Sequence, residues 1–311
     1  MSKNQVASIV RTGTVSIYPE LIQGSEEWHT ARCGLLTASE IKLILAREGG
    51  NTVTKYRCSG RQPARLTPKR EQALSRIGER AGTMRELAFS ADVSEGVLRD
   101  LVKEDAIEAL QVDVPLTFKA AGDEKQRAHL WELAAQRISR FVEPQYISDS
   151  MLRGHDDEIE ARDQYSQHYG EVRQVGFVTN DKWGFTLGCS PDGLVGDDGM
   201  IEAKSRCQKY QVQTICEHFE KGGIPEDFVL QVQSELLVTE RAWCDFISYS
   251  GGLPMTAVRV YPDPVIQDAI VDAAAKFEAR INEAIATYHA ALRSKARLIP
   301  TERKIIQEMF V

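Results

Sequence analysis

The sequence predicts an α/β (α+β) fold in which a mixed central sheet is flanked by helices. Helical and strand patterns follow one another in the order helix, inserted helices, helix, three strands, helix, two strands and a final helix. A turn at 196–199 between two short apolar strands is a strong hairpin signal. The composition, with 42% hydrophobic and 27% charged residues over 311 positions, is typical of a globular protein.

Charge and hydropathy exclude some classes of function. The formal net charge of −7 argues against a protein that coats nucleic acid through bulk charge, although a local basic groove remains compatible with it. No apolar stretch approaches the roughly 18 residues that a membrane span needs. Residues 1–11 lack the pattern of a secretory signal. We therefore expect a cytoplasmic protein with no membrane partner.

The six cysteines are scattered and contain no C-x-x-C pair. Zinc and iron–sulfur sites need closely spaced ligands, so we expect free thiols and no iron–sulfur cluster.

The N-terminal helical region spans residues 21–46. Its amphipathic pattern places Trp28 and Arg32 on one helical line. Thr37, followed three positions later by Glu40, has the form of a capping box and predicts the start of a second helix.

Residues 50–118 read as an insertion between two parts of one domain, 1–49 and 119–311. A basic stretch up to residue 65 is followed by helical patterns over 66–110, of which 84–101 resembles a helix-turn-helix. A short strand pattern from residue 112 would complete a winged-helix-like subdomain. Because basic and acidic residues balance here, docking to DNA and docking to protein are equally compatible with the pattern.

The rest of the chain predicts the elements of the main domain. Helices are expected at 124–141, from 151, at 228–238 and at 265–292, and strands at 172–178, 184–189, 193–195, 200–204, 243–249 and 257–261.

The hairpin around residues 189–204 carries the chemistry. Alternation along a strand places Glu202 and Lys204 on the same face, and the hairpin brings Asp192 within about one rung of Glu202. Two carboxylates and an ammonium therefore converge. Carboxylates are the hard oxygen ligands that Mg²⁺ prefers, and a neighbouring lysine can orient or deprotonate a water, or stabilise charge on a phosphate.

This Asp…Glu-x-Lys pattern resembles the signature of the PD-(D/E)xK nuclease superfamily. Three further blocks, at 23–40, 154–162 and 230–233, are similar to those of the phage lambda exonuclease and YqaJ viral recombinase family and occur in the same order. The resemblance extends over about 21–48 and 120–290.

The resemblance implies roles at the cleavage centre. Asp192, Glu202 and the carbonyl of Ala203 would bind Mg²⁺, for which Mn²⁺ would substitute, with two ions per site. Glu158 would contact the metal directly or through water, and Lys204 would assist the attacking water.

Further roles follow from the same resemblance. Gln231 would position the nucleophile or the lysine, and Arg32 and Ser39 would hold a terminal 5′-phosphate. The acidic residue that the family places some ten positions before Asp192 has no clean match, because Lys182 occupies that position with Asp181 beside it.

The function implied is a Mg²⁺-dependent 5′→3′ double-strand DNA exonuclease of phage or prophage origin, which resects ends for single-strand annealing recombination in the cytoplasm of a bacterial host. The resemblance also implies a ring-shaped homotrimer and a single-strand-annealing protein as partner. Two alternatives stay open: a structure-specific or restriction-type endonuclease on the same fold, and a catalytically inert adaptor that docks DNA or protein.

Overall fold

The computed structural model describes residues 9–144, 148–294 and 297–303. The chain divides into two compact units, one made of residues 1–46 and 120–311 and the other of residues 47–119, where the sequence analysis expected an insertion at 50–118. Most of the N-terminal stretch that lacks a secretory-signal pattern, residues 1–8, lies outside the described residues. Among the helices described, none has the length and apolar character to span a membrane.

The first sheet of the larger unit leads the chain into the hairpin around residues 189–204. Its five strands lie in the order β1 (Val10–Thr12), β2 (Val15–Tyr18), β9 (Phe177–Asn180), β10 (Leu187–Cys189) and β3 (Leu36–Thr37). Only the β10–β3 pairing is parallel among those of this sheet. All four residues of β9 are buried. Strand β10 ends at Cys189, directly before the loop that carries Asp192.

The second sheet carries the hairpin itself. Its order is β14 (Thr256–Val260), β13 (Trp243–Tyr249), β12 (Gly199–Ser205), β11 (Gly193–Val195) and β8 (Val172–Arg173). Strands β12 and β13 pair in parallel over seven residues, whereas the other pairings are antiparallel. The predicted mixed α/β class is confirmed, but the strands form two sheets where one central sheet was expected.

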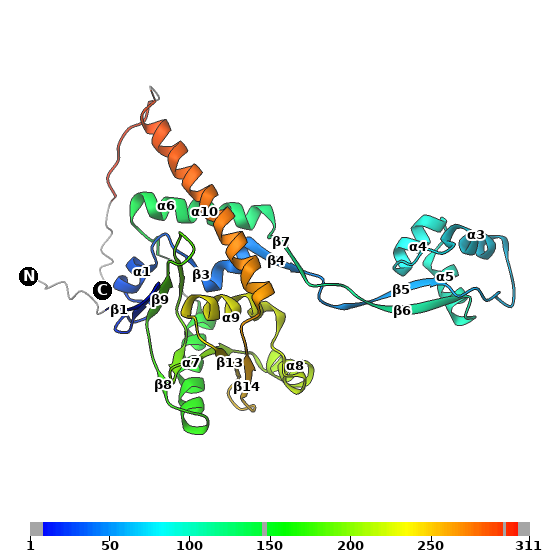
Figure 1. Ribbon diagram of the computed structural model, residues 1–311, viewed down its shortest axis with the longest axis horizontal. Coiled ribbons are helices and arrows are strands. Elements are labelled where there is room, and N and C mark those ends of the chain that lie inside the picture. Colours follow the sequence, from blue (N-terminus) through cyan, green and yellow to red (C-terminus); the bar gives the residue numbers. More distant parts are fainter. Residues whose placement is uncertain (1–8, 145–147, 295–296, 304–311) are drawn as a thin grey trace, which may run out of the picture. The chain divides into compact units, whose positions relative to one another are not determined.

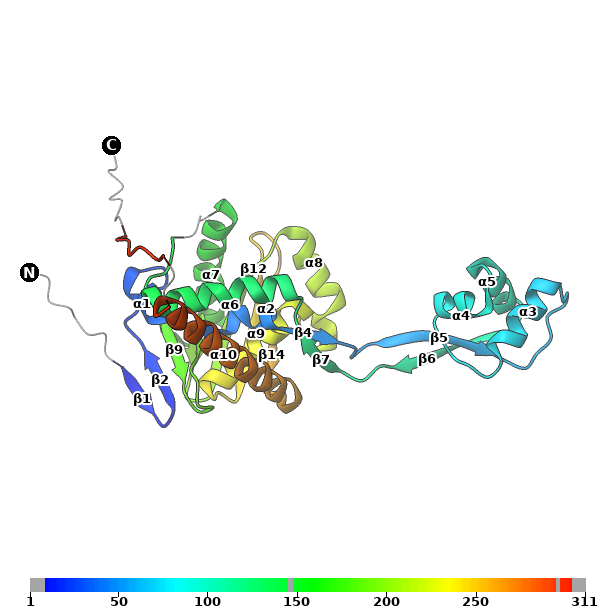
Figure 2. The ribbon, with the colours of Figure 1, turned by 90° about the horizontal axis from the view of Figure 1, so that it is seen from above.

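The helices of the larger unit cover and join these sheets (Figures 1 and 2). Helix α9 contacts strands of both sheets, α7 packs on β12, and α10 packs against α6 and α9. Leu230, Val232 and Leu236 are buried on α9. The helices are α1 (Glu26–Arg32), η1 (Ala38–Glu40), α2 (Ile41–Ile44), α6 (Asp123–Ser139), α7 (Asp149–His168), α8 (Gln208–Glu217), η2 (Phe219–Lys221), α9 (Glu226–Thr239) and α10 (Pro264–Leu292).

The N-terminal helical region is shorter than its pattern indicated. Helix α1 ends at Arg32, and Gly34 follows with a φ of 73°, a left-handed conformation that favours glycine. The chain then enters β3 to pair with β10. The capping box of Thr37 and Glu40 is confirmed, but it begins a short 3₁₀ turn that continues into α2.

The smaller unit is a β-ribbon with three helices gathered at one end (Figure 1). Strands β5 (Thr52–Cys58) and β6 (Ile107–Asp113) pair antiparallel, and α3 (Pro68–Ile77), α4 (Met84–Ala91) and α5 (Glu95–Lys103) enclose its core. Strands β4 (Leu45–Glu48) and β7 (Thr117–Ala120) pair where the chain enters and leaves the unit. Two expectations were wrong: β5 lies inside the presumed basic arm, and the helical segment stops before Ile107.

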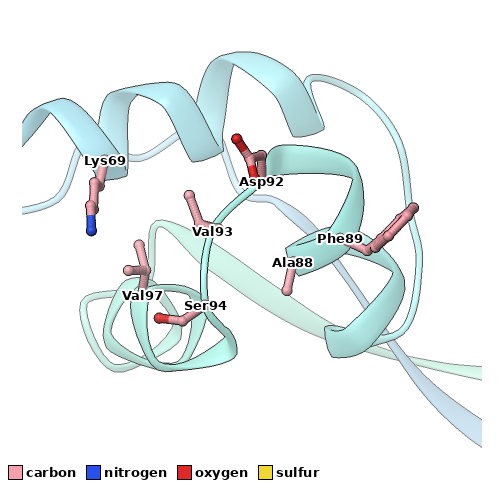
Figure 3. A pocket seen from close by; sticks show the side chains of 7 residues that line it. All are labelled: Lys69, Ala88, Phe89, Asp92, Val93, Ser94 and Val97. Atoms are coloured by element: carbon pink, nitrogen blue, oxygen red, sulfur yellow. The ribbon is translucent and has the colours of Figure 1, made fainter.

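The helix-turn-helix pattern corresponds to α4 and α5. Asp92 ends α4 in the left-handed conformation, with a φ of 57°, and Leu98 and Leu101 of α5 are fully buried. Phe89 is 91% exposed beside a surface hollow (Figure 3). The hollow is lined by Lys69, Ala88, Phe89, Asp92, Val93, Ser94 and Val97.

A buried ion pair joins α6 to α10. Arg137 donates two hydrogen bonds to the carboxylate of Glu278, at 2.7 and 2.6 Å, and a third to the carbonyl of Gly34. We predict that Arg137→Met lowers the free energy of unfolding by about 3–5 kcal/mol, because it leaves a buried carboxylate unpaired.

Urea denaturation followed by tryptophan fluorescence measures this effect in the larger unit, since all four tryptophans lie in it (Trp28, Trp131, Trp183 and Trp243). The control is Arg11→Met, which removes an exposed pair with Asp181 and should cost no more than about 1 kcal/mol. Equal losses in the two variants would contradict the prediction.

Candidate active site

The hairpin register brings the two predicted metal ligands together. Gly193 pairs with Ile201, so Asp192 lies opposite Glu202. Both carboxylates are buried, with exposed fractions of 8% and 2%. The backbone N–H of Ala203 donates to Oδ2 of Asp192 at 2.6 Å. A side chain at Gly193 would clash with Val172, so the strands pack closely at this point.

Lys204 and Gln231 both donate to Glu202. Lys204 lies on the same face of β12 as Glu202 and forms an ion pair with its Oε1. Gln231, on α9, donates from Nε2 to the same oxygen at 2.5 Å. Three of the predicted residues thus meet at one carboxylate oxygen.

Glu158 approaches from α7. It lines a cavity of about 360 Å³ together with Asp192. One turn further along α7, Arg162 donates to the backbone carbonyl of Asp192 at 3.0 Å, which fixes the loop before β11. Glu158 therefore borders the open side of the cluster, where Asp192 can be reached from outside.

Glu235 is a fourth carboxylate that the sequence analysis did not single out. It is 1% exposed, and its Oε1 accepts a hydrogen bond from Gln231 at 2.9 Å. The sequence contains one indication of its position: Glu235 follows Gln231 by four residues, and residues with this spacing share a helix face. Asp181, by contrast, lies in an exposed ion pair with Arg11 and does not join the cluster.

Burial dominates the electrostatics of these carboxylates. It raises the pKa of Asp192 and of Glu202 to about 8. The charge of Glu202 further raises the pKa of Asp192, and the charge of Glu235 further raises the pKa of Glu202. Burial also raises the pKa of Glu158 and of Glu235 to about 7. For Lys204 burial alone would lower the pKa, but the surrounding carboxylates outweigh it and raise the pKa. Lys204 is therefore protonated at neutral pH.

The cluster has the donor set of a divalent-cation site. Four carboxylates surround one ammonium, and the Oε2 atoms of Glu202 and Glu235 are buried without a hydrogen-bond partner. Within the described ranges no three acidic, histidine or cysteine side chains are already arranged as a metal cage. Oxygen-rich, under-neutralised carboxylates nevertheless fit Mg²⁺, which keeps several waters and needs only one or two carboxylate ligands. Asp192, Glu202 and the Ala203 carbonyl are the groups placed to hold it, with Glu158 beside them.

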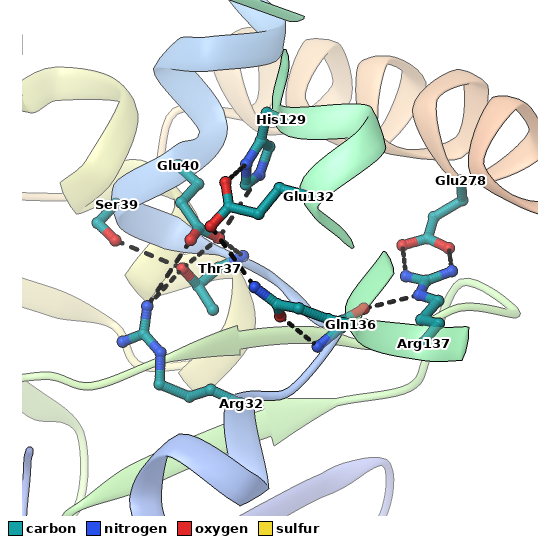
Figure 4. A network of polar contacts seen from close by, with 10 residues as sticks. Arg32, Thr37, Ser39, Glu40, His129, Glu132, Gln136, Arg137 and Glu278 are labelled. Carbon is teal, nitrogen blue, oxygen red and sulfur yellow. Dashed lines mark hydrogen bonds and ion pairs between the residues drawn. The ribbon is translucent and has the colours of Figure 1, made fainter. Parts of the chain in front are cut away.

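Arg32 and Ser39 meet at Thr37 (Figure 4). Arg32 donates to the hydroxyl of Thr37 at 3.1 Å, and the hydroxyl of Ser39 lies 3.4 Å from the same oxygen. Arg32 also stacks over Trp28, with 4.2 Å from its guanidinium carbon to the ring centroid. Burial lowers the pKa of Arg32, and the charge of Glu40 partly offsets this shift.

A polar network behind Arg32 holds this corner in place (Figure 4). Glu40 accepts hydrogen bonds from the backbone N–H of Thr37, at 2.9 Å, and from its hydroxyl, at 2.7 Å. Its other oxygen lies 3.9 Å from Arg32. Glu40 is thus shared between Thr37 and Arg32, so the guanidinium is only loosely paired with an acid.

The corner and the cluster are linked through the loop between them. The indole N–H of Trp28 lies 3.1 Å from the hydroxyl of Ser190 and 3.0 Å from the carbonyl of Gly176. The charges of Arg32, Glu202 and Glu235 all act on the buried thiol of Cys189. Arg32 and the carboxylate cluster therefore both lie near Cys189.

Comparison with known proteins gives the family that the chain resembles. Residues 119–242 match the model of the YqaJ-like viral recombinase domain, and the predicted family resemblance is confirmed. All four buried or half-buried carboxylates, Lys204 and Gln231 lie inside the match. No curated protein matches the chain significantly.

Solved structures show the same fold. An alkaline exonuclease from Laribacter hongkongensis, LHK-Exo, is 24% identical with a TM-score of 0.52, over 86% of this chain and all of that one. Its complex with dAMP matches at 24% identity with a TM-score of 0.51 over the same shares. A phage-related exonuclease from Haemophilus somnus is 11% identical with a TM-score of 0.39, over 55% of this chain and 86% of that one.

The buried carboxylates make stability depend on pH. Because their pKa values are raised from about 4 in the unfolded chain to about 7–8 in the folded one, the stability present at low pH is lost as pH rises through that range. We predict that the Tm measured in EDTA falls between pH 5.5 and pH 8, by calorimetry.

Matched variants locate the effect. The double substitution Asp192→Asn and Glu202→Gln should flatten the fall, whereas Asp181→Asn, outside the cluster, should leave it unchanged. A Tm that is constant or rises over this interval in the unsubstituted protein would refute the electrostatic description.

Proposed function

We propose that the protein is a Mg²⁺-dependent exonuclease of phage or prophage origin that degrades double-stranded DNA from 5′ ends, acting in the cytoplasm of a bacterial host. The observation that carries this proposal is the pair of buried carboxylates, Asp192 and Glu202, with the half-buried Lys204 beside them, within the stretch that matches the YqaJ-like domain. The fold shared with an alkaline exonuclease supports it.

The side chains have distinct tasks in phosphodiester hydrolysis. Asp192, Glu202 and the carbonyl of Ala203 would hold the cation, with Glu158 as a further ligand directly or through water. When bound, Mg²⁺ would lower the pKa of a water and offset the charge that develops on the phosphate; Mn²⁺ would substitute, and we propose two ions per site.

Lys204 acts as a cation in this scheme. The surrounding carboxylates raise its pKa, so the ammonium would stabilise negative charge on the scissile phosphate and orient the attacking water. The water oxygen bonds to phosphorus and gives up a proton to solvent, the bond from phosphorus to the 3′-oxygen breaks, and the leaving 3′-oxygen takes up a proton from solvent. A 5′-mononucleotide with a 3′-hydroxyl leaves, and the shortened strand keeps a new 5′-phosphate.

Arg32 and Ser39 would bind the terminal 5′-phosphate. A guanidinium and a hydroxyl are suitable partners for a phosphate dianion, and the loose pairing of Arg32 with Glu40 leaves donors for it. Since each turnover regenerates a 5′-phosphate, the same corner can receive the end of the strand again.

The family resemblance supports further proposals about assembly. A ring-shaped homotrimer would enclose duplex DNA and would need basic residues only along its channel, which reconciles DNA binding with a net charge of −7. A single-strand-annealing protein would be the partner that takes up the exposed strand.

One assay tests the proposed activity. Linear DNA with 5′-phosphate, linear DNA without it and circular DNA are each incubated with the full chain in Mg²⁺ or in EDTA. We expect rapid, Mg²⁺-dependent digestion of phosphorylated linear DNA, slower digestion of dephosphorylated ends and no cleavage of circles. Lys204→Ala should lower the rate at least ~100-fold, as does removal of a donor that stabilises transition-state charge.

The matched control is Lys182→Ala, which removes an exposed lysine paired with Glu240 outside the cluster and should leave the rate unchanged. Cleavage of circular DNA would contradict the proposed exonuclease activity and would show that the protein is an endonuclease. If no substrate is cut in Mg²⁺ or Mn²⁺, the inert adaptor is the better description.

A further inference from the structure

Glu235 is a buried carboxylate to which the scheme above gives no task. It is 1% exposed on α9, where Val232 and Leu236 are also buried. An ionisable group in such surroundings is costly unless it makes specific hydrogen bonds. Its position beside Glu202 and Gln231 indicates that this carboxylate is buried to serve the active site.

Gln231 is held by two carboxylates at once. Its Nε2 donates to Oε1 of Glu202 at 2.5 Å and to Oε1 of Glu235 at 2.9 Å. Carboxylate oxygens need donors, so the nitrogen side of the amide must face them. Both N–H groups of Gln231 are then used, and its Oε1 is the polar atom left to bind another group.

Glu235 holds the amide without being a proposed cation ligand. The nearer acceptor, Glu202, also accepts from Lys204 and is the proposed cation ligand, whereas Glu235 accepts from Gln231 and has no ligand role in the scheme. The terminal torsion of a glutamine is broad and roughly two-fold, so an amide without a dedicated acceptor turns over easily. Glu235 lies one helical turn beyond Gln231, which fixes the distance between them.

We propose, building on the nuclease function, that Glu235 is a positioning residue that locks the amide of Gln231 with its oxygen toward the reacting groups. Gln231 then acts as a hydrogen-bond acceptor for the attacking water and does not donate to the phosphate. Glu235 itself touches neither substrate nor nucleophile and works through Gln231 alone.

A double-mutant cycle tests the coupling. Glu235→Ala should lower kcat roughly 10- to 100-fold, the range expected for a misplaced catalytic group, with KM for DNA unchanged. In a Gln231→Ala background the same change should have no further effect. Glu235→Gln keeps an acceptor oxygen and should retain activity within a few-fold of the unsubstituted chain.

Gln233→Ala is the matched control. Gln233 is 2% exposed on the same helix but hydrogen-bonds the backbone at Tyr261 and Asp263, away from the cluster. It should lower Tm without changing kcat. If Glu235→Ala behaves like this control, or if its effect multiplies with that of Gln231→Ala, the positioning role is wrong.

A second measurement separates this proposal from the proposed activity. The side-chain NH₂ of Gln231, assigned by its loss in Gln231→Ala, should show slow hydrogen exchange by NMR in the full chain and in Glu235→Gln, and fast exchange in Glu235→Ala. Unchanged exchange in Glu235→Ala would overturn the locking of the amide. A protein that shows this pattern but cuts no DNA would overturn only the nuclease function.

Discussion

Four carboxylates lie around a single ammonium in the interior of this protein, and most of the larger unit serves to bring them there. Asp192 and Glu202 come from the two strands of one hairpin, Glu158 from the helix packed on it, and Glu235 from the helix that contacts both sheets. Lys204 balances only part of this charge. The remaining negative charge is stabilised when the carboxylates bind protons or further cations, and the raised pKa values of Asp192 and Glu202 show how readily they bind protons.

The same architecture connects the carboxylate cluster to the corner formed by Arg32, Thr37 and Ser39. Strand β10 runs from the first sheet into the loop before Asp192, and Ser190 in that loop contacts Trp28, over which Arg32 stacks. The arginine corner and the carboxylate cluster are therefore parts of one packed unit. In the proposed function, this packing would hold the 5′-phosphate site at a fixed separation from the cleavage centre, as removal of a constant length from a strand end requires.

Much of the fold could be predicted because its signals are local. The 243–249 strand was placed without error, and the hairpin turn and alternation were enough to pair Asp192 with Glu202. Strand β1 was missed because all three of its residues are exposed, so it carries no buried alternation. Glu235 was missed because the packing of α9 brings it to Gln231 and Glu202, and a spacing of four does not reveal that packing by itself.

Binding of a catalytic divalent cation by the carboxylate cluster can be observed by anomalous diffraction from crystals of the full chain soaked in Mn²⁺. We expect an anomalous peak in contact with Asp192, Glu202 and the carbonyl of Ala203, which disappears in Asp192→Asn crystals soaked in the same way. Absence of a peak at this place, or a peak only at surface carboxylates, would show that the cluster does not bind the cation.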